Sequence, residues 1–341
     1  MNLNNKKIDN YGLNFVGTGS AIPSQFVKNN DLGNRVDTND EWIKTRTGIC
    51  GRRVIGENES LSDLCTKAAH KAILNANWTP ESIDMIIVAT STPDDLFGMA
   101  PKIQSNLNAK NAFAFDLTAA CSGFLFAVVT ASQYLINGAV KRVIVLGADQ
   151  LSSWVDWDDR GSCVLFGDAA GAIAIERKDI EVDDLFAFLL KSDGSRGNCL
   201  NLSLNKKYSS LVNSFKYQKG EYLPIQMNGQ EVYKFAVKEV PKILEELMQD
   251  QKINPNQLDW LLLHQANQRI LDSVAERFSV PQEKVLSNLT NYGNTSAATI
   301  PLMLDEAVSD GRVKRGDLIA SCGFGAGLSW GAALFRWHGA I

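Results

Sequence analysis

The chain has 341 residues, of which 45% are hydrophobic and 21% are charged, and its formal net charge is −4. These ordinary globular values exclude a disordered chain and a collagen-like repeat. The acidic balance disfavours a nucleic-acid partner. No run of about 18 apolar residues occurs, which disfavours a membrane span. We therefore expect a soluble, cytoplasmic protein that can bury a large core.

Six cysteines are scattered along the chain without C-x-x-C spacing, and only three histidines are present. A structural zinc site needs such ligands at short spacings, so no metal is expected. A chain with a large core does not need disulfides, and scattered cysteines are typical of proteins from a reducing compartment.

The predicted elements begin after an N-terminal stretch, residues 1–12, that is rich in Asn and Lys and predicts a flexible arm. Four short apolar runs then predict strands buried on both faces. They are residues 83–90, 143–147, 258–263 and 317–320. Apolar residues at helical spacing predict helices over residues 62–76 and 232–248, whereas the polar residues 192–221 predict surface loops. This alternation indicates an α/β fold.

Three short blocks of sequence recur in the same order at a separation of about 173 residues. The recurring pairs are 83–86 with 258–261, 117–118 with 289–290, and 138–142 with 311–315. The repeat predicts two similar halves, residues 13–180 and 181–341, related by a pseudo-two-fold axis. A site is then expected where the halves meet.

Cys121 is the first candidate for chemistry. It stands between an apolar strand pattern and a long apolar run, residues 122–136, that ends at Asn137 and Gly138. An all-round apolar helix is a buried one, and its N-terminus favours a thiolate and lowers the pKa of a cysteine. The alternative is a small buried core cysteine.

Three further candidates follow in the second half of the chain. His264 closes a predicted strand, and sites in α/β folds form at the carboxyl ends of strands. Asn294 corresponds through the repeat to the region of Cys121. The glycine-rich residues 323–327 offer backbone N–H groups for an oxyanion or a phosphate. The alternatives are a structural histidine, a turn or capping asparagine, and a plain tight turn.

Together these motifs resemble those of β-ketoacyl-acyl-carrier-protein synthase III. The family's Cys–His–Asn set matches Cys121 in AACSGF, His264 in HQAN and Asn294 in NYGNTSAA. Its N-terminal signature matches residues 37–49, and the resemblance extends from about residue 15 to residue 336. The resemblance implies the thiolase fold, a five-layered αβαβα arrangement of two duplicated halves.

The resemblance also implies a condensing acyltransferase that starts fatty-acid synthesis without a cofactor. Cys121 would take the acyl group of an acyl-CoA primer, for which acetyl-CoA is expected. The backbone N–H groups of Cys121 and Ala326 would hold the oxyanion. Neutral His264 and Asn294 would then stabilise the enolate that forms when malonyl-acyl carrier protein loses CO₂.

The family's CoA site carries over to five residues. Trp42 and Arg160 resemble the pair that sandwiches the adenine ring, with an indole on one face and a guanidinium on the other. Thr38 would bond the base, Arg46 would meet the phosphates, and Asn267 would contact the pantetheine arm.

The resemblance also implies a surface for carrier docking and a pocket for the acyl chain. The acidic carrier would be guided by Lys234, Arg269 and Arg277, but Glu276 stands where the family often has a lysine. Leu96 occupies the floor of the acyl pocket, which the family completes across a homodimer interface. It is not the aromatic residue of acetyl-specific members.

Other activities of the same fold remain open at this point. A related condensing enzyme or acyltransferase of specialised metabolism would share the Cys–His–Asn set. A hydroxymethylglutaryl-CoA synthase would need an upstream Glu, and residues 87–95 contain none. A non-catalytic scaffold would be expected to lack the nucleophile.

Overall fold

The computed structural model describes residues 11–179 and 186–339. Two five-stranded sheets form its frame, and both have the same strand order and the same mixture of parallel and antiparallel pairs. In order across the first sheet, the strands are β1 (Gly12–Ala21), β7 (Asp168–Lys178), β6 (Arg142–Gln150), β4 (Met85–Ala89) and β5 (Phe113–Leu117). In the second sheet they are β8 (Phe186–Ser192), β16 (Ser329–Arg336), β15 (Leu318–Gly325), β13 (Trp260–Leu263) and β14 (Val285–Leu286). The predicted duplication is therefore confirmed.

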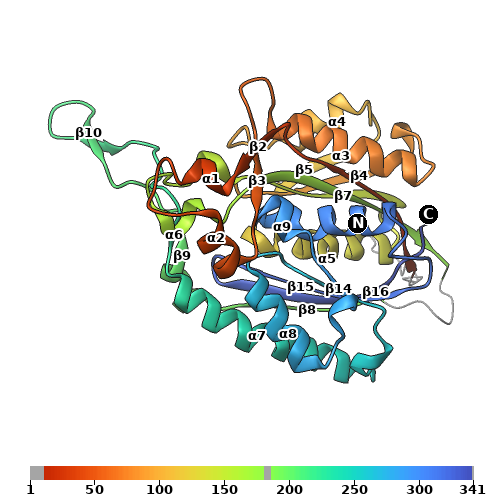
Figure 1. The fold of residues 1–341 in the computed structure, drawn as a ribbon. Helices are drawn as coiled ribbons and strands as arrows, with labels where there is room; N and C mark the ends of the chain where they lie inside the picture. The colour runs from red at the N-terminus through yellow and green to blue at the C-terminus, as the bar shows by residue number, and fades with distance from the viewer. Residues whose placement is uncertain (1–10, 180–185, 340–341) are drawn as a thin grey trace.

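Helices complete five layers around these sheets, as Figure 1 shows. The outer face of the first sheet is covered by α3 (Leu61–Asn75) and α4 (Ala100–Asn106). The outer face of the second is covered by α7 (Gly229–Asp250) and α8 (Gln268–Phe278). Between the sheets lie α5 (Gly123–Ile136) and α10 (Thr299–Ser309). The predicted thiolase-like architecture of two similar halves is thus present.

The central layer is held by apolar burial against both sheets. Phe124 and Leu125 of α5 belong to one core cluster with Ile300 and Leu304 of α10, and each of these side chains is at most 3% exposed. Burial of each is worth about 1.5–3 kcal/mol. Because both faces of α5 contact protein, its sequence is apolar all round, and it ends at Asn137 as predicted.

The shorter elements frame the edges of these layers. They are β2 (Gln25–Lys28), β3 (Gly51–Val54), α1 (Asn29–Leu32), α2 (Asp40–Thr47), α6 (Arg160–Cys163), α9 (Leu289–Tyr292) and β12 (Gln226–Met227). Single turns of 3-10 helix at Ala120–Ser122 and Ser296–Ala298 precede α5 and α10. No helix within residues 11–179 and 186–339 is long and apolar enough to cross a membrane.

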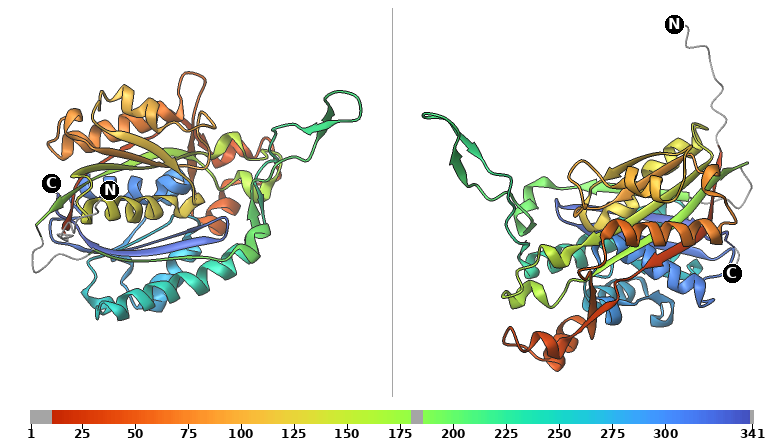
Figure 2. Two further views of the ribbon diagram at one scale, coloured as in Figure 1. Left: turned by 180° about the vertical axis from the view of Figure 1, so that it is seen from behind. Right: turned by 90° about the horizontal axis from the view of Figure 1, so that it is seen from above.

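The loop prediction for residues 192–221 is wrong in part. Strand β9 (Leu200–Asn201) pairs with β12, and β10 (Tyr208–Ser210) pairs with β11 (Lys216–Gln218). The β10–β11 hairpin extends away from the body of the molecule in every view of Figures 1 and 2. Because neither face of this hairpin is buried, its sequence lacks the alternation that reveals a strand.

The predicted N-terminal arm and domain boundary fall largely outside the described residues. Residues 1–10 and 180–185 are not described. The arm was predicted to extend to residue 12, and this boundary is wrong. Tyr11 donates its N–H to the Ile136 carbonyl oxygen at 3.2 Å, and β1 begins at Gly12. The division near residue 180 lies between β7 and β8 and stays a prediction.

Candidate active site

Cys121 lies at the junction of the two halves, in the 3-10 turn that leads into α5. Its neighbour Ala120 has a φ of 48°, a left-handed conformation that turns the chain sharply from strand to helix. Gly325 of β15 packs directly against it, because a Cβ on Gly325 would lie 2.6 Å from the Cys121 nitrogen. This strand therefore needs glycine here so that the second half can reach the cysteine.

Cys121, His264 and Asn294 line a single cavity of about 110 Å³. The ring of Phe324 lines the same cavity and meets the His264 ring edge-on, with 5.1 Å between centroids. Cys121 also lines a second cavity of about 470 Å³, and Trp154, Leu202 and Tyr222 contribute to its lining. Cys121 thus lines two cavities in the protein.

Ser296 connects all three of these side chains. Its hydroxyl donates to the Cys121 sulfur at 3.2 Å, and its backbone N–H donates to Asn294 Oδ1 at 2.8 Å. Its carbonyl oxygen accepts from the Thr299 hydroxyl at 3.0 Å, and Thr299 Oγ1 lies 2.8 Å from His264 Nδ1. Ser296 is 2% exposed and has a φ of 52°, so an unusual backbone conformation sits at the centre of the site.

The electrostatics of Cys121 differ from the prediction. Burial raises the pKa of the Cys121 thiol to about 12, although the hydrogen bond from Ser296 acts in the opposite direction. The expectation of a resting thiolate considered the helix end and not the loss of water around the sulfur. The resting group is a thiol, so attack on a substrate requires an acceptor for its proton.

His264 directly follows β13 and is 1% exposed. Burial lowers its pKa to about 3, which keeps the imidazole neutral near pH 7. The neutral state is the one that the sequence interpretation requires, because only a neutral ring has one nitrogen as a donor and the other as an acceptor.

Asn294 is fixed by the backbone and by its own side chain. Its N–H donates to the Leu165 carbonyl oxygen at 2.8 Å, and its carbonyl oxygen accepts from the Gly167 N–H at 3.0 Å. Because the side-chain oxygen accepts from Ser296, the amide NH₂ is the end left to donate.

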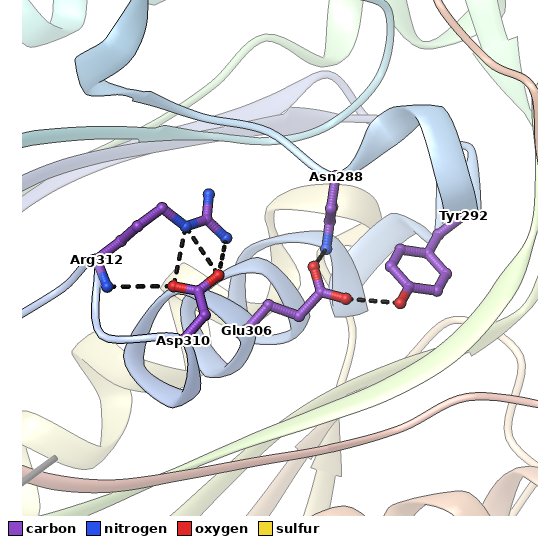
Figure 3. Close-up of polar contacts among 5 residues, drawn as sticks. All are labelled: Asn288, Tyr292, Glu306, Asp310 and Arg312. Carbon is purple, nitrogen blue, oxygen red and sulfur yellow. Dashed lines mark hydrogen bonds and ion pairs between the residues drawn. The ribbon is translucent and has the colours of Figure 1, made fainter.

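A carboxylate outside the cavity fixes the segment that leads to Asn294. Figure 3 shows Glu306 of α10 between two side chains at the ends of α9. It accepts from Asn288 Nδ2 at 2.8 Å and from the Tyr292 hydroxyl at 2.6 Å. The nearby Asp310 instead pairs with Arg312 at the exposed end of the same helix.

Asp149 at the end of β6 is a buried carboxylate close to the cysteine. Its Oδ1 accepts from the Thr90 hydroxyl at 3.2 Å, the Ser91 N–H at 2.8 Å and the Thr92 hydroxyl at 3.0 Å. Its Oδ2 accepts from the Ala297 N–H at 3.2 Å. One carboxylate thereby joins the first half to the turn that carries Ser296.

The residues predicted for CoA binding gather around α2. Arg160 lies 4.9 Å from the centre of the Trp42 ring, and Arg46 lies 5.7 Å from it. At that separation no adenine ring fits between Arg160 and Trp42, so a sandwich requires the guanidinium to swing outwards. The Thr38 hydroxyl oxygen is buried and has no hydrogen-bond partner among the described residues.

Asn267 is the residue that joins this region to the cavity. It caps α8 by accepting from the Arg269 N–H at 3.0 Å, and its amide donates to the Arg46 carbonyl oxygen at 3.2 Å. It also lines the cavity of Cys121.

Two of the three cations predicted for carrier docking have acidic partners. Lys234 lies 3.1 Å from Glu231, and Arg277 lies 2.9 Å from Glu245. The third, Arg269, donates to the Thr45 carbonyl oxygen at 3.3 Å. All three are exposed, but the paired acids reduce the positive charge that they present.

Leu96 is 83% exposed, and the neighbouring Phe97 is fully exposed. Leu96 lines the larger cavity beside Cys121, so this cavity has an exposed apolar side chain at its edge. Among the described residues, no group of three or more His, Cys, Asp or Glu side chains is placed to hold a metal ion.

Sequence reasoning missed Ser296, Thr299 and Asp149. The left-handed backbone of Ser296 has no signature in a sequence, because serine rarely adopts it. Asp149 had a recognisable signature, since it is an acidic residue at the carboxyl end of a buried strand, where sites form.

The duplicated five-layered fold, with a cysteine at the start of a buried helix between the halves, defines an acyl-transferring enzyme of the thiolase fold. Residues 115–194 match the family model described as 3-oxoacyl-[acyl-carrier-protein] synthase III. Residues 248–337 match the model for the C-terminal part of the same family.

Similar proteins span nearly the whole chain. A β-ketoacyl-[acyl-carrier-protein] synthase III of Prochlorococcus marinus (strain NATL2A) is 68% identical over 99% of this chain and 99% of its own. The crystal structure of 3-oxoacyl-[acyl-carrier-protein] synthase III from Aquifex aeolicus VF5 matches with a TM-score of 0.86 at 41% identity, covering 96% of this chain and all of that one. The priming β-ketosynthase of the R1128 polyketide pathway matches with a TM-score of 0.89 at 30% identity, covering 98% and 99%. The chain belongs to the β-ketoacyl-acyl-carrier-protein synthase III family.

Proposed function

We propose that the enzyme transfers the acyl group of an acyl-CoA primer to Cys121 and then condenses it with malonyl-acyl carrier protein. The products are a β-ketoacyl-acyl carrier protein, free CoA and CO₂. The observation that carries this proposal is that Cys121, His264 and Asn294 line one cavity.

In the first step, the Cys121 sulfur attacks the thioester carbon of the primer. The oxyanion that forms accepts hydrogen bonds from the backbone N–H groups of Cys121 and Ala326. Both residues line the larger cavity, which would then receive the acyl chain. CoA leaves through the smaller cavity towards Trp42 and Arg46, along the path that Asn267 lines.

In the second step, malonyl-acyl carrier protein occupies the smaller cavity. Neutral His264 and the Asn294 amide donate to its thioester oxygen while CO₂ leaves, and they stabilise the enolate charge. The enolate carbon then attacks the acyl group on Cys121. These steps use side chains and backbone N–H groups of the chain, so the proposal includes no cofactor.

The same proposal includes a homodimer in the cytoplasm. The exposed side chain of Leu96 lines the acyl cavity next to the fully exposed Phe97, and a second copy would cover both side chains. Six cysteines without a disulfide among the described residues suit a reducing compartment. Sedimentation analysis tests the dimer, and a monomer at micromolar concentration contradicts it.

The acylation step is tested by mass spectrometry after incubation with acyl-CoAs of increasing chain length. The wild type is expected to gain one acyl mass, located at Cys121, and the preferred chain length identifies the primer. Cys121→Ala should gain none, whereas Cys50→Ala serves as a matched control and should behave as the wild type. Acylation that persists in Cys121→Ala would show that another residue is the nucleophile.

A second candidate function is the priming step of a specialised pathway. The likeness to the R1128 priming β-ketosynthase favours it, with 30% identity over 98% of the chain. Condensation assays with carrier proteins of fatty-acid and polyketide synthesis side by side separate the two. The fatty-acid carrier is expected to react faster.

A further inference from the structure

We propose that Arg52 is a positioning residue for Asn294 in the decarboxylation step. Its guanidinium fixes the chain at the end of α6, and the residues that follow hold the Asn294 backbone. Arg52 itself touches no reacting atom in this account. The inference deepens the proposed function and rests on it.

Arg52 connects two parts of the first half through a side chain that is fully buried. It lies on β3, and its Nη2 donates to the carbonyl oxygen of Val164, directly after α6, at 2.9 Å. The same nitrogen donates to Asn29 Oδ1 at 2.9 Å, and Nη1 donates to the Val27 carbonyl oxygen at 3.4 Å. The guanidinium thus joins the end of α6 to the β2–β3 pair.

The three residues after this contact form the support of Asn294. The Leu165 carbonyl oxygen accepts from the Asn294 N–H at 2.8 Å, and the Gly167 N–H donates to the Asn294 carbonyl oxygen at 3.0 Å. Phe166 and Asn294 accordingly form a parallel bridge. Leu165 is the next residue in the chain after the carbonyl group that Arg52 holds. A movement of that group therefore passes directly to the Asn294 backbone.

The stem of the arginine side chain also packs against both chains of this bridge. A Cβ on Gly167 would lie 3.1 Å from the Arg52 Cβ, and a Cβ on Gly293 would lie 3.7 Å from it. Gly293 directly precedes Asn294 in the chain. Arg52 therefore contacts the support of Asn294 at its Cβ as well as at its guanidinium.

Stability alone does not explain an arginine at this place. Burial lowers the pKa of Arg52 to about 10, so the guanidinium is still charged near pH 7. Its three partner oxygens belong to a neutral amide and two peptide groups, and Nε has no hydrogen-bond partner among the described residues. A buried cation with such partners often costs more free energy than an apolar side chain of similar volume. What the guanidinium provides is a rigid plane of N–H groups aimed at fixed oxygens.

The Asn29 contact of the same guanidinium leads towards the CoA region. Asn29 Nδ2 donates to Asp40 Oδ1 at 3.0 Å, and Asp40 begins α2, the helix that carries two of the predicted CoA-binding residues. An effect of Arg52 on α2 would appear in the binding of acyl-CoA, whereas an effect on Asn294 would appear in the release of CO₂. The two steps of the reaction therefore separate these effects.

The test compares acylation of Cys121 by acyl-CoA with CO₂ release from malonyl-acyl carrier protein in Arg52→Met and Arg52→Lys. We expect CO₂ release at saturating carrier to fall about 100-fold in Arg52→Met, because a small misplacement of a catalytic group has an effect of this size. Arg52→Lys keeps the charge but not the plane of N–H groups, and a fall of about tenfold is expected. Acylation and the KM for acyl-CoA should stay at wild-type values. Arg52→Lys suffices if Arg52→Met does not fold.

Two further measurements show whether Arg52 acts through Asn294. In Asn294→Ala the amide is already absent, so adding Arg52→Lys should cause no further fall in CO₂ release. A merely structural role would lower the rate by the same factor in both backgrounds. Hydrogen exchange gives a readout without catalysis. The Asn294 N–H should exchange about tenfold faster in Arg52→Lys than in the wild type, because its acceptor is no longer fixed.

Arg53→Lys is the matched control. Arg53 is the next residue of the same strand, donates to the Ser24 carbonyl oxygen at 2.7 Å and lies over the Phe26 ring. This variant should keep the wild-type CO₂ release and exchange. Equal losses of acylation and CO₂ release in the Arg52 variants overturn the proposal, as does wild-type CO₂ release in either folded variant. A raised KM for acyl-CoA with normal CO₂ release places the effect on α2 and also overturns it.

The two proposals can fail separately. If the wild type releases no CO₂ but Arg52→Lys speeds exchange at Asn294, the proposed reaction is wrong and the positioning role stands. If the wild type releases CO₂ and the Arg52 variants match it in rate and exchange, the positioning role is wrong and the proposed reaction stands.

Discussion

The Thr299 hydroxyl lies 2.8 Å from Nδ1 of His264 and carries a single hydrogen that can point in two directions. When it points to the Ser296 carbonyl oxygen, 3.0 Å away, it accepts from Nδ1–H, and Nε2 is left without a proton. When it turns towards Nδ1, the proton of the neutral ring is on Nε2. The donation to the thioester oxygen proposed above needs this second orientation, so Thr299 controls whether His264 can donate to a substrate.

Thr299→Val should impair decarboxylation and spare acylation. The variant removes the group that selects the His264 tautomer, so CO₂ release from malonyl-acyl carrier protein is expected to fall about tenfold, or about 1.4 kcal/mol in activation free energy. Thr299→Ser keeps the hydroxyl and should retain most of the rate. Equal losses of acylation and decarboxylation in Thr299→Val would argue for a general packing defect instead.

The neutral state of His264 leads to a prediction about stability and pH. An unfolded histidine has a pKa of about 6.5, whereas burial lowers the pKa of His264 to about 3 in the folded chain. Below pH 6.5 the unfolded state therefore binds a proton that the folded state does not. The stabilisation is complete above pH 6.5 and is lost progressively as the pH falls towards 3.

His264→Asn should thus reduce the acid sensitivity of the fold. We expect the urea midpoint of the wild type to fall more between pH 7 and pH 5 than that of His264→Asn. The decarboxylation rate of the wild type should show no step from His264 over the same range. A step near pH 6.5 that disappears in the variant would mean that the imidazole titrates normally and is not desolvated.

Glu306 offers a test of how Asn294 is positioned. Glu306→Ala leaves Asn288 and Tyr292 without their shared acceptor, and the loss of a partly buried charged hydrogen-bond network costs about 1–3 kcal/mol. Unfolding in urea measures this loss, and CO₂ release should fall with it because α9 leads directly to Asn294. Asp310→Asn breaks only the exposed pair with Arg312 and is the matched control, with an expected effect within about 0.5 kcal/mol.

The architecture could be predicted from the sequence because both halves bury the same pattern of strands. The blocks around residues 83–86 and 258–261 lead into β4 and β13, which occupy equivalent places in their sheets. The β10–β11 hairpin could not be predicted in this way, since it buries no face. Local pattern reveals an element only where one side of it is shielded from water.

The candidate site was predictable in part for a similar reason. Cys121 and His264 stand at the ends of predicted elements, and the repeat relates Asn294 to the region of Cys121, so their convergence follows from topology. The hydrogen bonds of Ser296 depend on a left-handed backbone that serine seldom adopts, and the raised pKa of Cys121 depends on burial by the opposite half. Neither property belongs to a local stretch of sequence.

Gly325→Ala should block the nucleophile without dismantling the fold. The new Cβ would lie 2.6 Å from the Cys121 nitrogen, so the turn at Ala120–Ser122 must shift away from β15. Overpacking of this kind costs about 1–3 kcal/mol, and it displaces a backbone N–H that the reaction is proposed to use. Mass spectrometry should show little or no acylation at Cys121.

Gly323→Ala on the same strand is the control, since its Cβ would meet Ser122 Cα at 3.3 Å and needs only a small adjustment. Normal acylation of Gly325→Ala would show that the contact between β15 and Cys121 is dispensable.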